Sequence, residues 1–185
     1  MKILKTPVQL SEIKKLRVGD EILFSGTIFT VRDQAYNYIL KHNFSAIKNG
    51  VIYHAGPIVK QEGKKIIPIS AGPTTSTRFM ERSIKVMHKY HVNIFIGKAG
   101  MDDSKVKQAM KNKAIYLAAV GGAGVLYAQT MKIKNIYLKE LGMADAIWEI
   151  EVKDFPLIVT MDSKGHSIYH DIYLQSKKKI KKFLK

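Results

Sequence analysis

The chain has 185 residues, which is enough for one substantial domain but cramped for two. It contains no cysteine, so disulfides are excluded, and the chain by itself cannot hold a cysteine zinc site or an iron–sulfur cluster. Its 31 lysines and arginines against 15 aspartates and glutamates leave a net charge of +16, which suits a nucleic acid, an acidic partner subunit or a lysine-rich genome.

The sequence has no apolar run of the length needed to cross a membrane. Its first residues, Met1–Lys5, lack the long apolar core of a signal peptide. We therefore expect a cytoplasmic protein with no membrane association.

The C-terminal residues carry much of the positive charge, in a lysine run at 176–185. A charge run at a chain end is typical of a solvated tail or a frayed helix, so we predict one domain at 1–170 and a basic tail at 171–185. Neither an aromatic RNA-binding motif nor zinc-finger spacing accompanies the charge. Nucleic-acid binding therefore rests on charge alone.

The first half of the chain alternates helical and strand patterns. We predict a short helix at 11–16, strands at 21–31 and 65–70, a strand at 51–59 that Gly56-Pro57 interrupts, and a helix at 34–42. Arg32 stands at the junction between a strand and a helix, where α/β proteins place ligand-binding groups. On local grounds it is equally well an exposed arginine at a strand end. His54 has the residue type of a polar site group, but a histidine inside a strand is more often hydrogen-bonded locally.

The stretch from Ile69 to Met80 is the centre of the sequence. Gly72-Pro73 ends a strand, four hydroxyl residues follow, and a helical pattern then runs to His91. We predict that this helix begins near Thr74, where a hydroxyl caps free backbone N–H groups and the helix dipole favours an anion. Arg78 would then lie one turn later on the same face. An ordinary N-cap without a ligand is the competing interpretation.

The second half continues the same alternation. Predicted strands lie at 92–96, 114–120, 135–140, 146–152, 155–161 and 167–169, and predicted helices at 102–112 and 125–131. Two glycine-rich turns follow strands, at 97–100 and at 121–124. The first lacks the spacing of a P-loop and the second that of a dinucleotide-binding turn. The pattern predicts one mixed α/β domain.

Taken together, the polar strand ends and three further stretches resemble a known family, the β subunit or C-terminal domain of the class I iron–sulfur hydro-lyases, which comprise fumarate hydratase and L-tartrate dehydratase. The matching stretches are Thr30–Asp33, Tyr53–Pro57, Gly72–Arg78, Gly97–Gly100, Val120–Ala123 and Gly142–Pro156. They extend the resemblance from about residue 5 to 170 and leave the basic tail outside it.

The resemblance implies an α/β fold, a single swivelling β/β/α-type domain with a mixed sheet. It implies reversible hydration of a dicarboxylate, most simply fumarate to malate, shared with an α subunit that carries a [4Fe–4S] cluster, in an α₂β₂ or other hetero-oligomer. By position, Arg32, Arg78 and Lys98 match residues that hold substrate carboxylates, and Thr74 matches a catalytic threonine. This chain itself is expected to hold no metal. It departs from the family pattern at Thr75–Thr77 and at Ala99, which affects the expected shape of the pocket.

The residue chemistry agrees with this implication. A dicarboxylate needs two cationic groups, and an arginine fork matches a carboxylate in a bidentate way. A threonine hydroxyl is a weak base, so a carboxylate or histidine from the partner is required to abstract the carbon-bound proton. Two alternatives stay open at this stage: an L-tartrate dehydratase β subunit, and a stand-alone module that binds dicarboxylates or other anions.

Overall fold

The computed structural model describes residues 1–183 of the chain. Its strands are β1 Lys2–Lys5, β2 Glu21–Thr30, β3 Val51–Tyr53, β4 Ile58–Glu62, β5 Lys65–Ser70, β6 Ile94–Gly97, β7 Ile115–Ala118, β8 Met131–Tyr137 and β9 Ile147–Met161. Its α-helices are α1 Leu10–Ile13, α2 Asp33–Lys41, α3 Met80–Tyr90, α4 Ser104–Met110, α5 Gly124–Ala128 and α6 Ile168–Phe183. Short 3-10 turns lie at Ser45–Ile47, Ser76–Phe79 and Lys139–Leu141.

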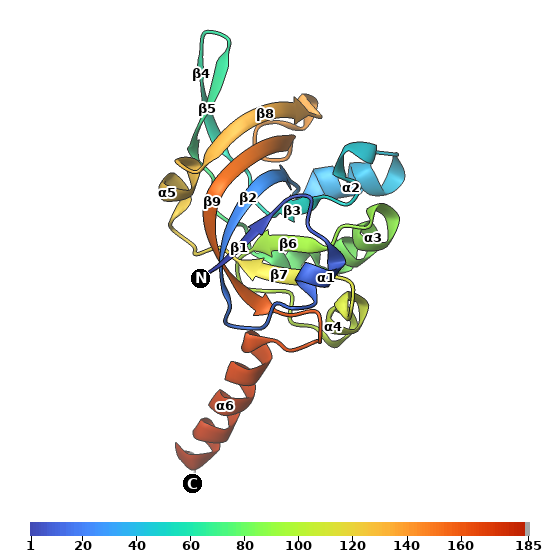
Figure 1. Ribbon diagram of the computed structural model, residues 1–185, viewed down its shortest axis with the longest axis vertical. Coiled ribbons are helices and arrows are strands. Elements are labelled where there is room, and N and C mark those ends of the chain that lie inside the picture. Colours follow the sequence, from blue (N-terminus) through green and yellow to red (C-terminus); the bar gives the residue numbers. More distant parts are fainter. Residues whose placement is uncertain (184–185) are drawn as a thin grey trace.

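One mixed sheet has the strand order β1-β2-β3-β6-β7-β9-β8. Strands β2, β3, β6 and β7 are parallel, and the long β9 pairs antiparallel with both β7 and β2, so these strands form a small, partly closed barrel. Helices α2, α3 and α4 cover one side, while the β4–β5 hairpin and α6 project from opposite ends (Figure 1). The predicted mixed α/β domain is confirmed at this level.

Two apolar clusters hold the fold together, one inside the barrel and one between the sheet and helices α2–α4. Strand β6 contributes to both: Ile94 and Ile96 face the barrel interior, and Phe95 packs toward the helices. A strand buried on both faces reads as a continuous apolar run, which is why 92–96 was recognisable from sequence. Each such side chain contributes about 1.5–3 kcal/mol of transfer free energy.

Gly26 shows how the barrel bends. The register between β2 and β9 shifts between Phe24 and Gly26, and Gly26 has a φ of 123°. A Cβ at this position would collide with the Thr6 side chain, whose Oγ1 accepts a hydrogen bond from the Thr27 N–H at 3.0 Å. Glycine is therefore required for both its conformation and its close contact.

Several expected elements are wrong in place or type. The α-helix after Gly72-Pro73 begins at Met80, not near Thr74. Of the strand expected at 167–169, only Ser167 forms an isolated bridge, to Met161, and Ile168 begins α6. The strand expected at 135–140 lies at Met131–Tyr137, and the two strands expected at 146–152 and 155–161 are one continuous β9. Strand β1 was not predicted. No helix within residues 1–183 is long and apolar enough to cross a membrane.

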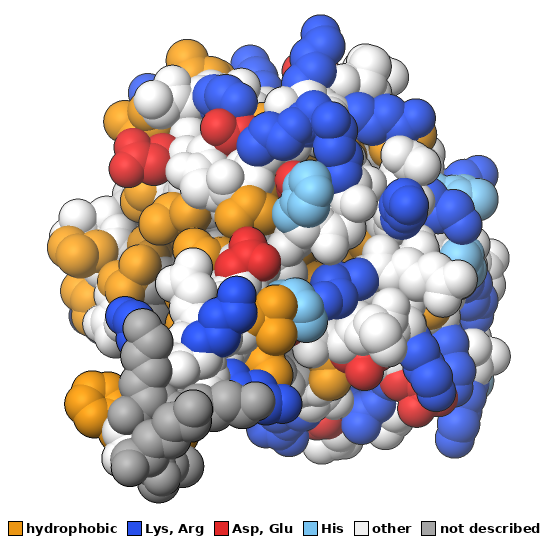
Figure 2. Space-filling model, turned by 90° about the horizontal axis from the view of Figure 1, so that it is seen from below, with side chains coloured by type: hydrophobic (Ala, Val, Ile, Leu, Met, Phe, Trp, Pro, Cys, Tyr) orange, Lys and Arg blue, Asp and Glu red, His pale blue; other side chains and the backbone are white. Residues whose placement is uncertain are grey.

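Positive charge is spread widely over the surface. Figure 2 shows lysine and arginine side chains over much of one face, with few acidic groups between them. Helix α6 runs through residue 170, where we expected the domain to give way to the tail, and its residues from His170 to Ile180 are exposed. The domain boundary itself stays a prediction.

Candidate functional site

The parallel strands bring three polar residues to one edge of the sheet. Arg32 follows β2, His54 follows β3 and Lys98 follows β6, and the carboxyl ends of parallel strands meet at the same edge. We call this the strand-end edge; it also includes the segment 72–78, which lies across it. The residues that we predicted for the site belong to this strand-end edge.

Thr74 is inserted between the ends of β3 and β6. Its N–H donates to the His54 carbonyl at 2.6 Å, and its carbonyl accepts the Lys98 N–H at 3.2 Å. Because both backbone groups are engaged as in a strand, Thr74 cannot begin a helix, and the expected help from a helix N-terminus is absent at this residue. Thr75 precedes the 3-10 turn and makes no side-chain cap to it. The structure therefore brings Thr74 beside Lys98 but corrects the reason we gave for it.

Arg32 is half-buried, and its guanidinium lies close to the loop at Gly56. A Cβ on Gly56 would lie 2.8 Å from a guanidinium nitrogen of Arg32 and 2.7 Å from the Ala144 carbonyl oxygen, so glycine at 56 makes room for both. The Nε of Arg32 is buried, and no hydrogen-bond acceptor reaches it within the part of the chain that the structure describes. A buried unpaired donor on a cation is costly, and an anion bound beside it would relieve that cost.

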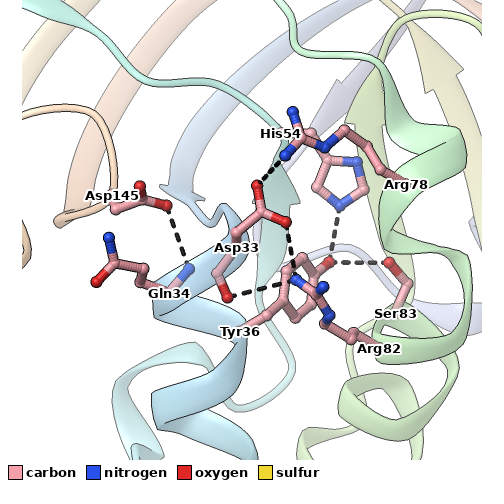
Figure 3. A network of polar contacts seen from close by, with 8 residues as sticks. All are labelled: Asp33, Gln34, Tyr36, His54, Arg78, Arg82, Ser83 and Asp145. Carbon is pink, nitrogen blue, oxygen red and sulfur yellow. Dashed lines mark hydrogen bonds and ion pairs between the residues drawn. The ribbon is translucent and has the colours of Figure 1, made fainter.

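Arg78 lies in the 3-10 turn and is tied to the start of α2. Its Nη2 donates to Asp33 Oδ2 at 2.6 Å, while Arg82 Nη1 donates to Asp33 Oδ1 at 3.0 Å (Figure 3). One carboxylate thus holds two guanidinium groups, and the Arg78 side chain remains 53% exposed. Asp33 and Arg82 were not predicted as members of the site. The i, i+4 spacing of Arg78 and Arg82 was the available signal, because it puts both on one face of a turn.

Lys98 is half-buried in the loop after β6. Gly121 of the neighbouring loop lies beneath its side chain, since a Cβ there would stand 3.6 Å from Lys98 Cδ. The next two residues, Ala99 and Gly100, have φ values of 63° and 69°. No carboxylate within residues 1–183 lies within 4.0 Å of the Lys98 ammonium or the Arg32 guanidinium. The strand-end edge therefore carries uncompensated positive charge.

Beneath this edge runs a buried chain of hydrogen bonds, which we call the His54 relay; its members are Ser83, Tyr36, His54, Ser76 and Tyr116. His54 is fully buried, with Nε2 2.7 Å from the Tyr36 hydroxyl and Nδ1 2.7 Å from Ser76 Oγ. Tyr36 continues to Ser83 Oγ at 2.9 Å (Figure 3), and the Tyr116 hydroxyl donates to Ser76 Oγ at 2.8 Å.

Burial decides the protonation state of the relay. It lowers the pKa of His54 to about 3, because the surroundings disfavour the charged imidazolium. Burial likewise raises the pKa of Tyr36 and of Tyr116 well above the usual value for a phenol. At neutral pH every member is uncharged, so His54 is a satisfied core residue here and not a surface base. The interpretation of His54 as locally hydrogen-bonded is confirmed.

The chemistry of this edge is that of anion binding. Within residues 1–183, Arg32 and Lys98 have no carboxylate partner, and Arg78 shares the Asp33 carboxylate with Arg82. Groups of three or more His, Cys, Asp or Glu side chains placed to hold a metal ion do not occur within residues 1–183. The fold is a partly closed α/β barrel with cationic side chains at the ends of its parallel strands, a place where α/β proteins commonly bind ligands.

Comparison with known proteins makes the class specific. Residues 2–172 match the family described as the fumarase C-terminus. The chain is 38% identical over 170 residues to the putative L(+)-tartrate dehydratase subunit beta of Methanocaldococcus jannaschii, covering 87% of each protein. It is 37% identical over 172 residues to the L(+)-tartrate dehydratase subunit beta of Escherichia coli K12, covering 90% of this chain and 86% of that one.

A third relative has a different organisation. The putative fumarate hydratase class I of Geobacillus stearothermophilus is 36% identical over 183 residues, which are 97% of this chain but 36% of that protein. The chain thus spans about a third of the length of that relative. The protein belongs to the fumarase C-terminal family, and the resemblance predicted from the strand-end motifs is confirmed.

Proposed function

We propose that this chain is the β subunit of a class I hydro-lyase, which adds water to and removes it from a dicarboxylate together with a cluster-bearing α subunit. The observation that carries the proposal is the placement of Arg32 after β2 and of Lys98 after β6, at one edge of the sheet, in a chain that belongs to this family. No carboxylate of residues 1–183 pairs with either cation. Two separated cations suit the two carboxylates of a small dicarboxylate.

Each proposed site residue has a distinct part. Arg32 presents a planar fork suited to a bidentate carboxylate, and Lys98 presents a point charge for the second carboxylate. Arg78, held by Asp33, contributes a third positive charge at the rim. The backbone of Thr74 is held next to Lys98, and in this proposal the Thr74 hydroxyl acts at the reacting carbon. A hydroxyl without an adjacent base is a poor proton acceptor, so the proton-abstracting group is assigned to the partner.

An iron–sulfur cluster does not fit the residues of this chain. The sequence has no cysteine, and residues 1–183 offer no group of three or more metal-binding side chains. We therefore assign the [4Fe–4S] cluster of the proposed enzyme to the α subunit and route no step of this chain's chemistry through it. The swivelling β/β/α arrangement, in which the domain moves against that partner, is part of the same proposal.

The relatives favour two substrates. The two β subunits that this chain matches along most of their length are named for L(+)-tartrate, and the long relative is named for fumarate. Fumarate and tartrate both carry two carboxylates, which the pair Arg32 and Lys98 accommodates alike. We propose fumarate and malate first and keep L-tartrate as the second candidate.

Reconstitution tests the proposal. The chain is co-expressed with its cluster-bearing partner, purified without oxygen, and assayed with fumarate, malate and both enantiomers of tartrate. We expect turnover of one substrate pair by the complex and none by either chain alone. Turnover by this chain alone would contradict a shared site. Calorimetric binding of malate or tartrate to the isolated chain, with an inactive complex, would instead identify a stand-alone anion-binding module.

A further inference from the structure

The His54 relay lies directly under the residues proposed to bind substrate. Its members come from α2, the end of β3, the 3-10 turn, α3 and β7, so it joins the elements that surround the strand-end edge. The relay has no charged member, and each hydroxyl or imidazole in it contacts at least one other member. A buried polar chain that is fully paired specifies one arrangement of the elements it connects, whereas an apolar core tolerates sliding.

Ser76 is the point where the relay meets the proposed site. Its side chain contacts His54 and Tyr116, and its N–H donates to the Lys98 carbonyl at 3.0 Å. The Tyr116 hydroxyl also lies 3.1 Å from that carbonyl. On the other side, the Lys98 N–H donates to the Thr74 carbonyl. The backbone of Lys98 is thus held by Thr74, by Ser76 and by Tyr116.

His54 holds the same segment twice. Its carbonyl accepts the Thr74 N–H, and its imidazole contacts Ser76 two residues later. Gly97 leaves room for this contact, because a Cβ there would collide with the Ser76 hydroxyl and lie 2.9 Å from the Tyr116 hydroxyl. Because the fit is close, a shift of the imidazole displaces Ser76, which bonds the Lys98 carbonyl. Thr74, which bonds the Lys98 N–H, moves with it.

The proton count of the relay is consistent with a neutral imidazole. In one direction Tyr116 donates to Ser76, Ser76 to Nδ1, and Nε2–H to Tyr36, which donates to Ser83. In the other direction Ser83 donates to Tyr36, Tyr36 donates to Nε2, and Nδ1–H donates to Ser76, which also accepts from Tyr116. Both arrangements satisfy His54 with one proton. The relay is therefore complete without an added charge or a ligand.

We infer that His54 is a positioning residue of the proposed dicarboxylate site: through Ser76, its imidazole sets where Thr74 and Lys98 stand. The inference rests on the proposed function, since it gives the buried relay a role in that site. His54 itself touches no substrate. Its effect is transmitted through two hydrogen bonds and the backbone of residues 74–76.

The first test compares variants in the complex with the partner subunit. Ser76→Ala removes the hydroxyl that joins the relay to the site, and we expect kcat/KM to fall at least tenfold, with kcat falling more than KM rises because Thr74 acts in the chemical step. Tyr90→Phe is the matched control, because Tyr90 is also a buried residue and its hydroxyl bonds only backbone groups outside the relay, the Phe44 N–H and the carbonyls of Ile39 and His42. We expect less than a twofold change for it.

The second test separates positioning from packing. His54→Asn keeps a polar group near the position of Nδ1, and His54→Leu keeps the volume without polarity. Positioning predicts that the asparagine variant retains at least fivefold more kcat/KM than the leucine variant. A filler of the core would give the opposite order, which would overturn the inference. Tyr36→Phe removes the remote partner of His54 without touching residues 74–76, and we expect an intermediate loss.

A third measurement does not depend on turnover. Amide hydrogen exchange of the full-length chain is compared for Ser76→Ala, Tyr90→Phe and the unchanged protein, at position 76 and at Lys98. We expect at least tenfold faster exchange at both amides in Ser76→Ala alone. If the unchanged complex converts no dicarboxylate, the proposed function fails and this exchange still decides the relay. Unchanged exchange, or an active Ser76→Ala complex within twofold of Tyr90→Phe, would overturn the inference.

Discussion

Two regions of the protein concentrate positive charge, the strand-end edge and helix α6, and they hold it in different ways. Arg32, Arg78 and Lys98 come from separate segments of the chain and are placed by backbone hydrogen bonds, by the shared Asp33 carboxylate and by contacts with glycines. In α6 the lysines at 177–179 follow one another on an exposed helix that projects from the body (Figure 1). Its contact with the body includes Tyr169, which packs on Gly100.

For recognition of a ligand, the place where a charge is held therefore matters more than the number of charges. Exposed lysines move freely and are screened by salt, so they recognise little beyond an opposite charge. A half-buried guanidinium with a fixed direction selects a carboxylate at a defined place. The net charge of +16 drew attention to the tail, but the small set of cations at the strand-end edge carries the proposed activity.

The largest effect is expected at Arg32, in the strand-end edge. Arg32→Ala in the complex removes the half-buried cation, and we expect kcat/KM to fall by about 30-fold to several thousand-fold, corresponding to about 2–5 kcal/mol for one partner of a buried charge pair. Lys178→Ala, an exposed α6 lysine, serves as the control and is expected to change kcat/KM less than twofold. Steady-state kinetics measures both, and equal effects for the two variants would remove the distinction between the regions.

A second effect concerns the support beneath the strand-end edge. Burial holds the folded-state pKa of His54 near 3, below its ordinary value of 6.5, so the unfolded chain binds a proton that the folded chain does not. The stability from this group is therefore complete above pH 6.5 and is lost as pH falls toward 3, by about 1.4 kcal/mol per pH unit within that window. Urea unfolding at pH 7, 6 and 5 measures the slope.

The control for this slope is the exposed His88, whose change to asparagine is expected to leave it intact. His54→Asn should remove the contribution of this one group and flatten the curve between pH 6.5 and 5. Identical slopes for His54→Asn and the unchanged protein would show that His54 accepts a proton as readily in the folded state as in the unfolded state.

A smaller effect is expected at the paired part of the edge. Asp33→Asn keeps the shape of the side chain but removes the charge that holds Arg78 and Arg82. Because the pair is partly exposed, we expect a loss of at most about 1 kcal/mol in the free energy of unfolding. We expect KM to rise about fivefold as Arg78 loses its fixed direction. Lys85→Ala, which breaks the exposed pair with Glu81, is the control, and a KM unchanged by Asp33→Asn would exclude Arg78 from substrate binding.

The smallest effect is expected in helix α6. Truncation after Tyr173 removes most of α6 and keeps Tyr169 on Gly100. Since residues 174–180 are exposed, we expect less than a twofold change in kcat/KM and little change in the thermal midpoint. Calorimetry and the assay of the complex measure both. A loss of partner binding on truncation would assign the tail to the subunit interface.

Local patterns predicted those parts of the fold that depend on nearby residues. Strand β5 was predicted with its observed bounds, Lys65–Ser70, because an apolar run lies between a turn and a Gly-Pro break. The helix at Thr74 failed because the Thr74 backbone is taken by His54 and Lys98, each more than 19 residues away in the chain. Hydroxyl residues after Gly-Pro look the same in either case.

The site shows the same division. Arg32, Thr74, Arg78 and Lys98 were selected from strand-end motifs, and the structure places them at one edge, while their roles stay a prediction. Asp33 stands just before the helix predicted at 34–42, and nothing local indicates that Arg78 and Arg82 both reach it. The relay was equally hidden, because Tyr36, Ser83 and Tyr116 read as ordinary members of their elements.

The sequence was sufficient to predict the α/β class, the family, the absence of cysteine ligands and the residues at the ends of the strands. These follow from composition, periodicity and short motifs, which are local properties of the chain. Four features became evident only in the folded structure. They are the closure of the barrel by β9, the sharing of the Asp33 carboxylate by two arginines, the extended backbone at Thr74 and the burial of His54. Those outcomes depend on which distant backbone and side-chain groups satisfy one another once water is excluded, and that pairing is made only in the folded chain.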